Sequence, residues 1–420
     1  MQRPGPRPKR RSGAWRLVGV CGSHVGSVAE CIGLHRMNQT IGTRSLYYAR
    51  ADRAAARRIR AWDHPGTDGA LLRRSRKPIV IASRRSPLAR VQAEAVGRCL
   101  GKRHGVEVKY VWITSEGDRV RDRPLAELGG KALFTKAVDE ALLRREADIA
   151  VHSLKDVPTQ MTLGLRLAAT PRRGSAVDVL ITKSTLAGVE TPAQLPAGTR
   201  VGTSSPRRIA QLRALNPDLR ITLLRGNIDS RLAAVRGKQA ELDATLLAAA
   251  GLERLGVTDH AGRVQNIDAL MPAAAQGALA TVCRADDHDS LTRCLPLNHA
   301  ETGTAVTAER ELVRHLGADC HSPIAVLCEP VDPAETVAKR NSDSHWFRIR
   351  AKAVSIDGSR VVTFDDRSKT RDLRRLVRRA ADSLVDQGAE DILQDAARAE
   401  LFDAAPVGPP QPTTASVPQA

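Results

Sequence analysis

The sequence feature that most limits the fold is a repeated change of hydrophobic period between residues 77 and 298. Ile79–Ala82 is a short apolar segment that predicts a strand, and Ser86-Pro87 then places a capping residue before proline at the first helical position. Apolar residues recur at helical spacing from Leu88 to Cys99, and Val106–Thr114 returns to the spacing of a strand. Strand, helix and strand within about 35 residues predict a βαβ unit.

The same alternation continues along the chain. Further strands are predicted at Ala147–Val151, Arg200–Gly202, Arg220–Leu223 and Ala244–Ala248, and helices from Ser205 onward and over Asn227–Arg236. Strands joined by crossover helices pair in parallel. The sequence therefore predicts an α/β fold with mainly parallel sheets up to about residue 297.

Beyond Asn298 the pattern changes. A helix is predicted over Thr304–Leu316, a hairpin over Trp346–Val354 and Arg360–Phe364, and an amphipathic helix from Leu373 to Leu384 that Gly388 closes. These elements predict a small α+β domain after the α/β part.

Positive charge is concentrated at the beginning of the chain. The net charge is +19, yet residues 1–77 hold 17 Lys and Arg against 4 Asp and Glu, and the remaining residues hold 48 against 42. Because this leader is rich in Arg, Gly and Pro and has no sustained period, we expect disorder over 1–77, and also in the proline-containing tail over 406–420. Three interpretations of the leader stay open: a secretion signal, an organelle transit peptide, and an extension without a role, which we favour.

Composition argues against several classes of protein. No apolar run approaches the roughly 20 residues that span a bilayer, so we expect no membrane partner. The seven cysteines form no C-x-x-C pair, which argues against a disulfide framework or a zinc ribbon and is typical of the cytoplasm. Aromatic residues make up 3% of the chain, too few for the stacking surfaces of single-strand binders, so we expect no nucleic-acid partner.

Five short segments combine charged and reactive side chains. They are Ser83–Ala89, His152–Pro158, Gly202–Arg208, Arg225–Arg231 and Leu316–Pro323. Three of them place arginines at the start of a predicted helix, where backbone amides and the positive helix end bind anions. Arginine binds carboxylates with two parallel hydrogen bonds, so the number of arginines predicts a ligand with several negative groups. Capped helices with solvated arginines are the alternative.

The other two segments add groups with reactive chemistry. Ser153, Lys155 and Asp156 lie together at a predicted strand end, and this crowding of reactive groups argues against the alternative of a surface ion pair between Lys155 and Asp156. Cys320 lies in a loop, and His321 beside it favours the thiolate, although loop cysteines are more often inert than reactive.

Taken in this order, the segments resemble the hydroxymethylbilane synthase (porphobilinogen deaminase) family. The similarity runs from about Pro78 to about Ala404. It also includes Gly129-Gly130-Lys131, Ala249–Leu252, Gln276–Ala278, Asn298-His299 and Ala308–Arg310. Each motif alone is weak evidence, whereas the ordered set is highly specific.

The resemblance implies a transferase of tetrapyrrole biosynthesis. Such an enzyme joins four porphobilinogen molecules head to tail to the linear hydroxymethylbilane and releases ammonia at each step. It implies one dipyrromethane cofactor per chain, held by a thioether to Cys320. The implied fold is α/β, with two domains like periplasmic solute-binding proteins and a small C-terminal α+β domain that carries the cofactor. We expect domain 1 over 78–171 with 277–297, domain 2 over 172–276 and domain 3 over 298–405, in a cytoplasmic monomer.

The resemblance also assigns roles to residues, because a chain of pyrroles with acetate and propionate side chains is a polyanion. Asp156 matches the catalytic aspartate, which stabilises the cation that forms when ammonia leaves. The implied cofactor-binding residues are Arg84, Ser86, Lys155, Asp156, Thr203, Ser204, Ser205, Arg207, Arg208 and Cys320. The implied substrate-binding residues are Arg84, Arg85, Lys131, Ser153, Arg225, Arg231, Arg254 and Gln276, and no metal is implied.

Three residues depart from the family pattern. Ala132 and Asp319 stand where glycine is usual, and Pro206 lies inside the Ser-Ser…Arg-Arg segment. The resemblance makes loop 115–132 a lid over the cleft.

Two other classes of protein compete with this interpretation. A non-catalytic solute-binding protein explains the anion-binding segments but requires neither Asp156 beside Lys155 nor a loop cysteine in a third domain. A nucleic-acid-binding protein explains the basic leader, but no recognised binding motif accompanies it.

Overall fold

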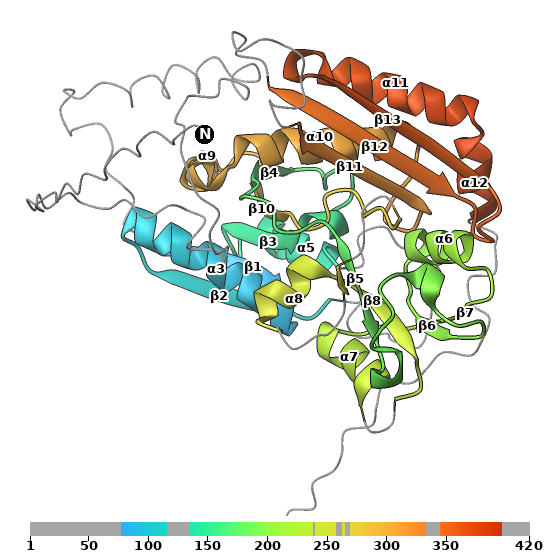
Figure 1. Ribbon diagram of the computed structural model, residues 1–420. Helices are drawn as coiled ribbons and strands as arrows, with labels where there is room; N and C mark the ends of the chain where they lie inside the picture. The colour runs from blue at the N-terminus through green and yellow to red at the C-terminus, as the bar shows by residue number, and fades with distance from the viewer. Residues whose placement is uncertain are drawn as a thin grey trace, which may run out of the picture.

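The structure is a computed structural model that describes residues 77–115, 134–237, 240–257, 263–264, 269–331 and 345–396 (Figure 1). The leader before Lys77, the segment 116–133 and the tail over 406–420 lie outside the described residues, so the predictions of disorder and of a lid are not addressed. Lys131 and Ala132 belong to that segment. None of the described helices has the length and apolar character that a membrane span requires.

The first sheet has five strands in the order β2-β1-β3-β10-β4. They are β1 (Ile79–Arg84), β2 (Val108–Ile113), β3 (Ile149–Ser153), β4 (Leu165–Ala169) and β10 (Leu279–Arg284). The predicted βαβ unit is confirmed, because α3 (Pro87–His104) joins the parallel neighbours β1 and β2. Since side chains alternate along a strand, Ile79 and Ile81 pack under α3 and α9 (His288–Cys294), whereas Ala82 packs under α5 (Lys136–Leu143) on the other face.

The second sheet repeats this arrangement in the order β7-β6-β8-β5-β9. Its strands are β5 (Asp178–Thr182), β6 (Arg200–Gly202), β7 (Arg220–Thr222), β8 (Ala244–Ala248) and β9 (Arg263–Val264). Helix α6 (Pro206–Leu215) covers one face, and α7 (Ile228–Arg236) and α8 (Ala249–Leu255) cover the other.

The expectation of mainly parallel sheets was wrong. In each five-stranded sheet two neighbouring pairs are parallel and two are antiparallel. The reversed strands, β10 and β5, are the ones at which the chain enters a sheet after crossing from the other sheet. An apolar strand has the same composition in either direction, so the hydrophobic pattern carried no sign of this reversal.

The third sheet is antiparallel, with β11 (Ile324–Pro330), β12 (Trp346–Val354) and β13 (Val361–Lys369), and it confirms the predicted hairpin. One face packs under α10 (Ala300–His315) and α11 (Leu373–Asp386). A further helix, α12 (Ala389–Ala396), follows Gly388, whose φ of 93° ends α11, and the sequence analysis missed it. The other face rests through Ala325 and Leu327 on Met271 and Ala176, in the two segments that connect the first and second sheets.

One sheet therefore forms within each of the three predicted segments, and the exact domain boundaries stay a prediction. We call the parts built on these sheets the first, second and third bodies. The third body touches both crossing segments, which places the loop between α10 and β11 beside the junction of the first two bodies.

Candidate functional site

A cavity of about 1110 Å³ lies where the three bodies meet. Its wall contains the carboxyl end of β1, the turn after β3, the first turns of α6 and α7, and the loop after α10. The predicted site residues that line it are Arg84, Arg85, Ser86, Lys155, Asp156, Ser204, Ser205, Arg207, Arg208, Arg225, Arg231, Gln276 and Cys320. Folding thus collects the reactive groups of all five segments in one space.

Three predicted site residues do not line this cavity, because each is engaged elsewhere. The Ser153 hydroxyl exchanges hydrogen bonds with the Gln92 amide at 3.2 and 3.3 Å. Thr203 is fully buried and its Oγ1 accepts from the backbone N–H of Ser205. The guanidinium of Arg254 donates to the Gly277 carbonyl. The fourth, Lys131, lies outside the described residues.

The serines before the two proline-led helices do not cap them through their side chains. Ser86 and Ser205 occupy the N-cap positions of α3 and α6, but neither side chain makes a capping hydrogen bond, although one was predicted for Ser86. Asn227 does cap α7, accepting from the Ser230 N–H. Both serine hydroxyls belong to residues of the cavity wall, where they can donate to a carboxylate.

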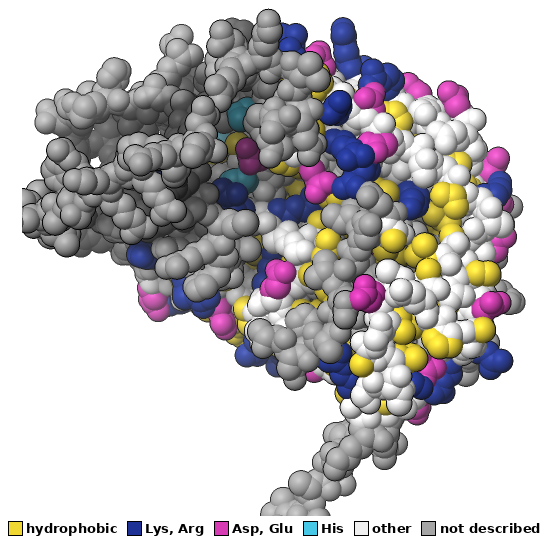
Figure 2. All heavy atoms as spheres, in the orientation of Figure 1, with side chains coloured by type: hydrophobic (Ala, Val, Ile, Leu, Met, Phe, Trp, Pro, Cys, Tyr) yellow, Lys and Arg dark blue, Asp and Glu magenta, His cyan; other side chains and the backbone are white. Residues whose placement is uncertain are grey.

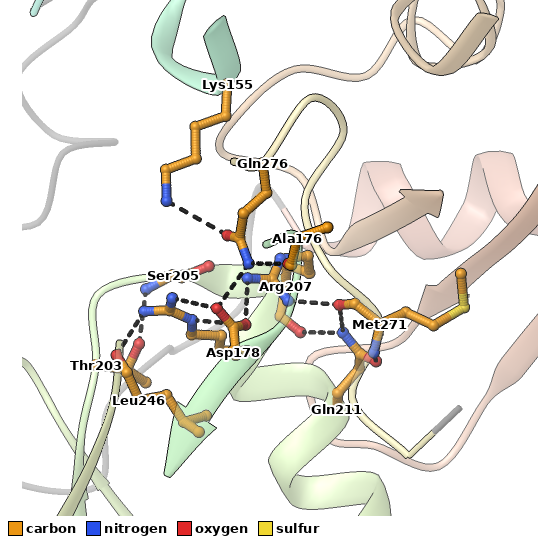
Figure 3. Close-up of polar contacts among 11 residues, drawn as sticks. Lys155, Ala176, Asp178, Thr203, Ser205, Arg207, Gln211, Leu246, Met271 and Gln276 are labelled. Carbon is orange, nitrogen blue, oxygen red and sulfur yellow. Dashed lines mark hydrogen bonds and ion pairs between the residues drawn. The ribbon is translucent and has the colours of Figure 1, made fainter. Parts of the chain in front are cut away.

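A buried carboxylate that the sequence analysis missed organises the second body's side of the site. Asp178 is fully buried and accepts from Arg207 Nη2 at 2.8 Å and from Arg208 Nη2 and Nε at 2.7 and 3.1 Å. Gln276 donates to the same carboxylate at 2.8 Å, and its Oε1 accepts from Lys155 Nζ at 3.3 Å (Figure 3). The sequence signal for this carboxylate was a charged residue at the first position of the apolar strand β5.

This network links the first and second bodies electrostatically. Burial alone raises the pKa of Asp178, but Arg208 and Arg207 outweigh it and hold that pKa far below its usual range. Burial lowers the pKa of Lys155 to about 8, while neighbouring Asp156 opposes the shift. Asp178 therefore offsets one of the two positive charges of Arg207 and Arg208, and Lys155 keeps a charge that is sensitive to pH near neutrality.

Two further groups line the cavity without having been predicted. The guanidinium of Arg84 lies 4.4 Å from the centre of the Phe134 ring, a cation–π contact that fixes its direction. Arg310 of α10 reaches the loop that follows Asp156. The sequence pattern gave no sign of the Phe134 contact, whereas Arg310 stood in a family-like motif without a role.

Cys320 differs from the other cysteines that the structure describes. It is exposed and lines the cavity, whereas Cys99, Cys283, Cys294 and Cys328 are buried. Burial raises the pKa of Cys283 to about 11 and of Cys294 to about 12, which keeps these thiols protonated and inert. The carboxylate of Asp319 accepts from the His321 N–H at 2.9 Å and from the Ser322 hydroxyl at 3.2 Å, so it shapes the loop that presents Cys320.

Fold and site together define an α/β protein with a cation-lined cavity between two similar bodies and a third body that presents a thiol to it. Residues 79–292 match the family model described as "Porphobilinogen deaminase, dipyromethane cofactor binding domain". The chain belongs to the porphobilinogen deaminase family, which confirms the resemblance seen in the motifs.

Curated relatives agree with this assignment. A porphobilinogen deaminase from Sphingopyxis alaskensis is 48% identical over 255 residues, which cover 60% of this chain and 80% of the relative. Those from Trichlorobacter lovleyi and Thermobifida fusca are 38% and 40% identical, each covering 77% of this chain and 98% of the relative. Among solved structures, a YaeC-family lipoprotein from Enterococcus faecalis aligns at 14% identity with a TM-score of 0.32, covering 54% of this chain and 93% of that chain.

Proposed function

We propose that this chain joins four porphobilinogen molecules head to tail into hydroxymethylbilane, as a transferase of tetrapyrrole biosynthesis. The observation that carries the proposal is that the exposed Cys320 thiol, Asp156 and the arginine-rich helix starts line one cavity. Membership of the porphobilinogen deaminase family supports the reaction and a dipyrromethane cofactor.

The residues of the cavity fit a dipyrromethane held by a thioether. The group carries several carboxylates, and the wall offers Arg84, Ser86, Ser204 and Ser205 as well as Lys155 to bind them. Cys320 is the exposed thiol among the cysteines described, as the attachment requires. When bound, the dipyrromethane supplies the pyrrole carbon to which each new substrate unit is joined.

Asp156 is the proposed catalytic residue. Loss of ammonia from porphobilinogen leaves positive charge on the substrate's pyrrole, and a carboxylate facing the pyrrole N–H stabilises that charge as it develops. The proton released when the ring regains aromaticity can pass to the same carboxylate. Lys155, adjacent in sequence, is a cation whose pKa is lowered by burial, and the carboxylate of Asp156 opposes that lowering.

The other arginines are proposed to bind the acetate and propionate groups of the substrate and the growing chain. Arg85, Arg225 and Arg231 line the cavity and supply positive charge from the first and second bodies. Burial lowers the pKa of Arg231 to about 10, so it remains a cation at physiological pH.

Mass spectrometry of the intact protein tests the proposal. The holoenzyme should be heavier than the sequence by one dipyrromethane, with the adduct on the peptide that contains Cys320. Cys320→Ser should fold, carry no adduct and form no hydroxymethylbilane, whereas Cys328→Ala, a buried cysteine of the same body, should retain both. An adduct on another cysteine would contradict the assignment. Porphobilinogen that is bound but not consumed would instead indicate a solute-binding protein.

We also propose that the protein is a cytoplasmic monomer without a nucleic-acid partner. The five described cysteines form no disulfide, and residues from all three bodies of one chain line the cavity. Basic and acidic side chains are interspersed over the coloured part of the face in Figure 2, rather than forming a field of one sign. Size-exclusion chromatography with light scattering, and cell fractionation, test these points.

A further inference from the structure

Arg310 is the group through which the third body holds the loop after Asp156. Its Nη1 donates to the Val157 carbonyl at 2.7 Å, and its Nη2 donates to the carbonyls of Pro158 and Thr159 at 2.6 and 3.4 Å. Three successive carbonyls therefore converge on one guanidinium. Such charge-assisted hydrogen bonds are shorter and stronger than bonds between neutral groups.

The turn that carries Asp156 is held from a second direction as well. The turn is η2 (Leu154–Asp156), and the Leu154 N–H donates to the Ala278 carbonyl at 3.0 Å. Lys155 donates to Gln276 in the same crossing segment. The crossing segment thus fixes the start of this turn, and Arg310 fixes the residues that follow it.

Helix α10 is itself held firmly, so Arg310 is a fixed support. The adjacent Glu309 is fully buried and accepts from Arg173 Nη1 at 2.6 Å. It also accepts from the backbone N–H of Ala275 at 2.5 Å and of Cys328 at 2.8 Å. These contacts tie α10 to the crossing segments and to β11.

The same helix leads to the cysteine loop. Helix α10 ends at His315, and the loop that follows it carries Cys320 before β11 begins at Ile324. One rigid helix therefore contacts the Asp156 loop through Arg310 and leads directly into the Cys320 loop.

We infer that Arg310 is a positioning residue that sets where the carboxylate of Asp156 lies relative to the Cys320 loop. This inference rests on the proposed function, since it needs Asp156 as the catalytic group and Cys320 as the attachment point. A reacting group misplaced by about 1 Å can lose roughly 100-fold in rate, so a support of this kind affects turnover without touching the substrate.

The test compares Arg310→Met, which keeps the aliphatic stem and removes every donor, with Arg310→Lys, which keeps one charged donor group. Hydrogen–deuterium exchange of the peptide covering Leu154 to Gln160 should rise at least 10-fold in Arg310→Met and less in Arg310→Lys. The kcat should fall about 10- to 100-fold in the first and recover partly in the second, with KM changed less than about 3-fold. The Cys320 adduct should remain.

Arg378→Met is the matched control, because Arg378 is an exposed arginine on α11 of the same body. It should leave exchange, kcat and KM unchanged. Unchanged exchange in Arg310→Met would overturn the inference, as would a raised KM at unchanged kcat, which would make Arg310 a ligand for substrate carboxylates. If Arg310→Met does not fold, wild-type exchange and wild-type kcat in Arg310→Lys would overturn it equally.

A further variant separates this inference from the proposed function. Asp156→Asn should abolish turnover but leave the exchange of this loop low. If Asp156→Asn stays active, the assignment of Asp156 fails, whereas the exchange of Arg310→Met still reports whether Arg310 holds the loop.

Discussion

The first and second bodies share one pattern of two parallel and two antiparallel strand pairs, with the reversed strand at the fourth position of each sheet, yet they contribute different chemistry. Strand β3 of the first body ends at Ser153 and is followed by the turn η2, which carries Lys155 and Asp156. The corresponding strand β8 of the second body runs into Ala249-Ala250 without an ionisable group. The shared topology therefore provides two similar anion-binding rims, and one of them carries the carboxylate proposed for catalysis.

The arginines of the two bodies also differ in their surroundings. Arg84 and Arg85 precede their Ser-Pro pair and lie at the strand end, with Arg85 exposed. Arg207 and Arg208 follow theirs, so they lie in the first turn of α6 and are about 95% buried against Asp178. A displacement of a few residues relative to proline thus separates the more exposed arginines of the cavity wall from those buried against Asp178.

The largest expected loss of turnover is at Asp156, which has no counterpart in the second body. Asp156→Asn keeps the size of the side chain but removes the negative charge, so kcat should fall ~10²–10³-fold or more while thermal stability stays near that of the wild type. Steady-state assays with porphobilinogen and a melting curve measure both. Asp218 is an exposed carboxylate of the second body outside the cavity, so the control Asp218→Asn should change neither kcat nor thermal stability. Near wild-type turnover in Asp156→Asn would show that the first body does not supply a catalytic carboxylate.

Matched substitutions of one arginine in each body test whether buried and exposed arginines have different roles. Arg207→Leu removes one of two guanidinium partners from a buried carboxylate, which should destabilise the fold toward the lower end of about 3–5 kcal/mol, because Arg208 and Gln276 remain. Arg85→Leu should leave the melting temperature within about one degree but slow elongation, with partly extended chains accumulating on the enzyme. Denaturant unfolding and intact mass spectrometry give the two readouts. Equal losses of stability would show that the two arginine positions are equivalent.

The smallest effect concerns the charge of Lys155. With a pKa lowered to about 8 by burial, Lys155 is charged below pH 8 and neutral above it, so the apparent affinity for porphobilinogen should weaken several-fold between pH 7 and pH 9. In Lys155→Met the affinity for porphobilinogen should depend less on pH over the same range. Between about pH 8 and the ordinary lysine value of 10.5 the unfolded chain binds more protons than the folded one, so this group makes folding more favourable as pH rises. Weaker binding above pH 8 is therefore distinct from unfolding.

The sequence predicted the elements and most of the cavity wall because these depend on local patterns. The strand at Ile79, the helix after Pro87 and the hairpin around Gly358 follow from hydrophobic period and from turn residues, which act within a few positions. The five polar segments marked the cavity because side chains at strand ends and helix starts share a rim whichever way the body is assembled.

Strand direction and contacts between distant segments were decided by tertiary structure alone. Thr203 has a side chain that could donate to a carboxylate, but it is fully buried and its Oγ1 accepts from a backbone N–H. Arg207 and Arg208, expected at the ligand, donate to Asp178, which belongs to no recognisable motif. A charged side chain leaving water pairs with the nearest opposite charge that folding supplies, and that partner lies 29 positions from Arg207. The sequence by itself determined which groups reach the cavity rim, whereas tertiary packing decided which of them remain available to a ligand, because burial and pairing depend on segments brought together only in the folded chain.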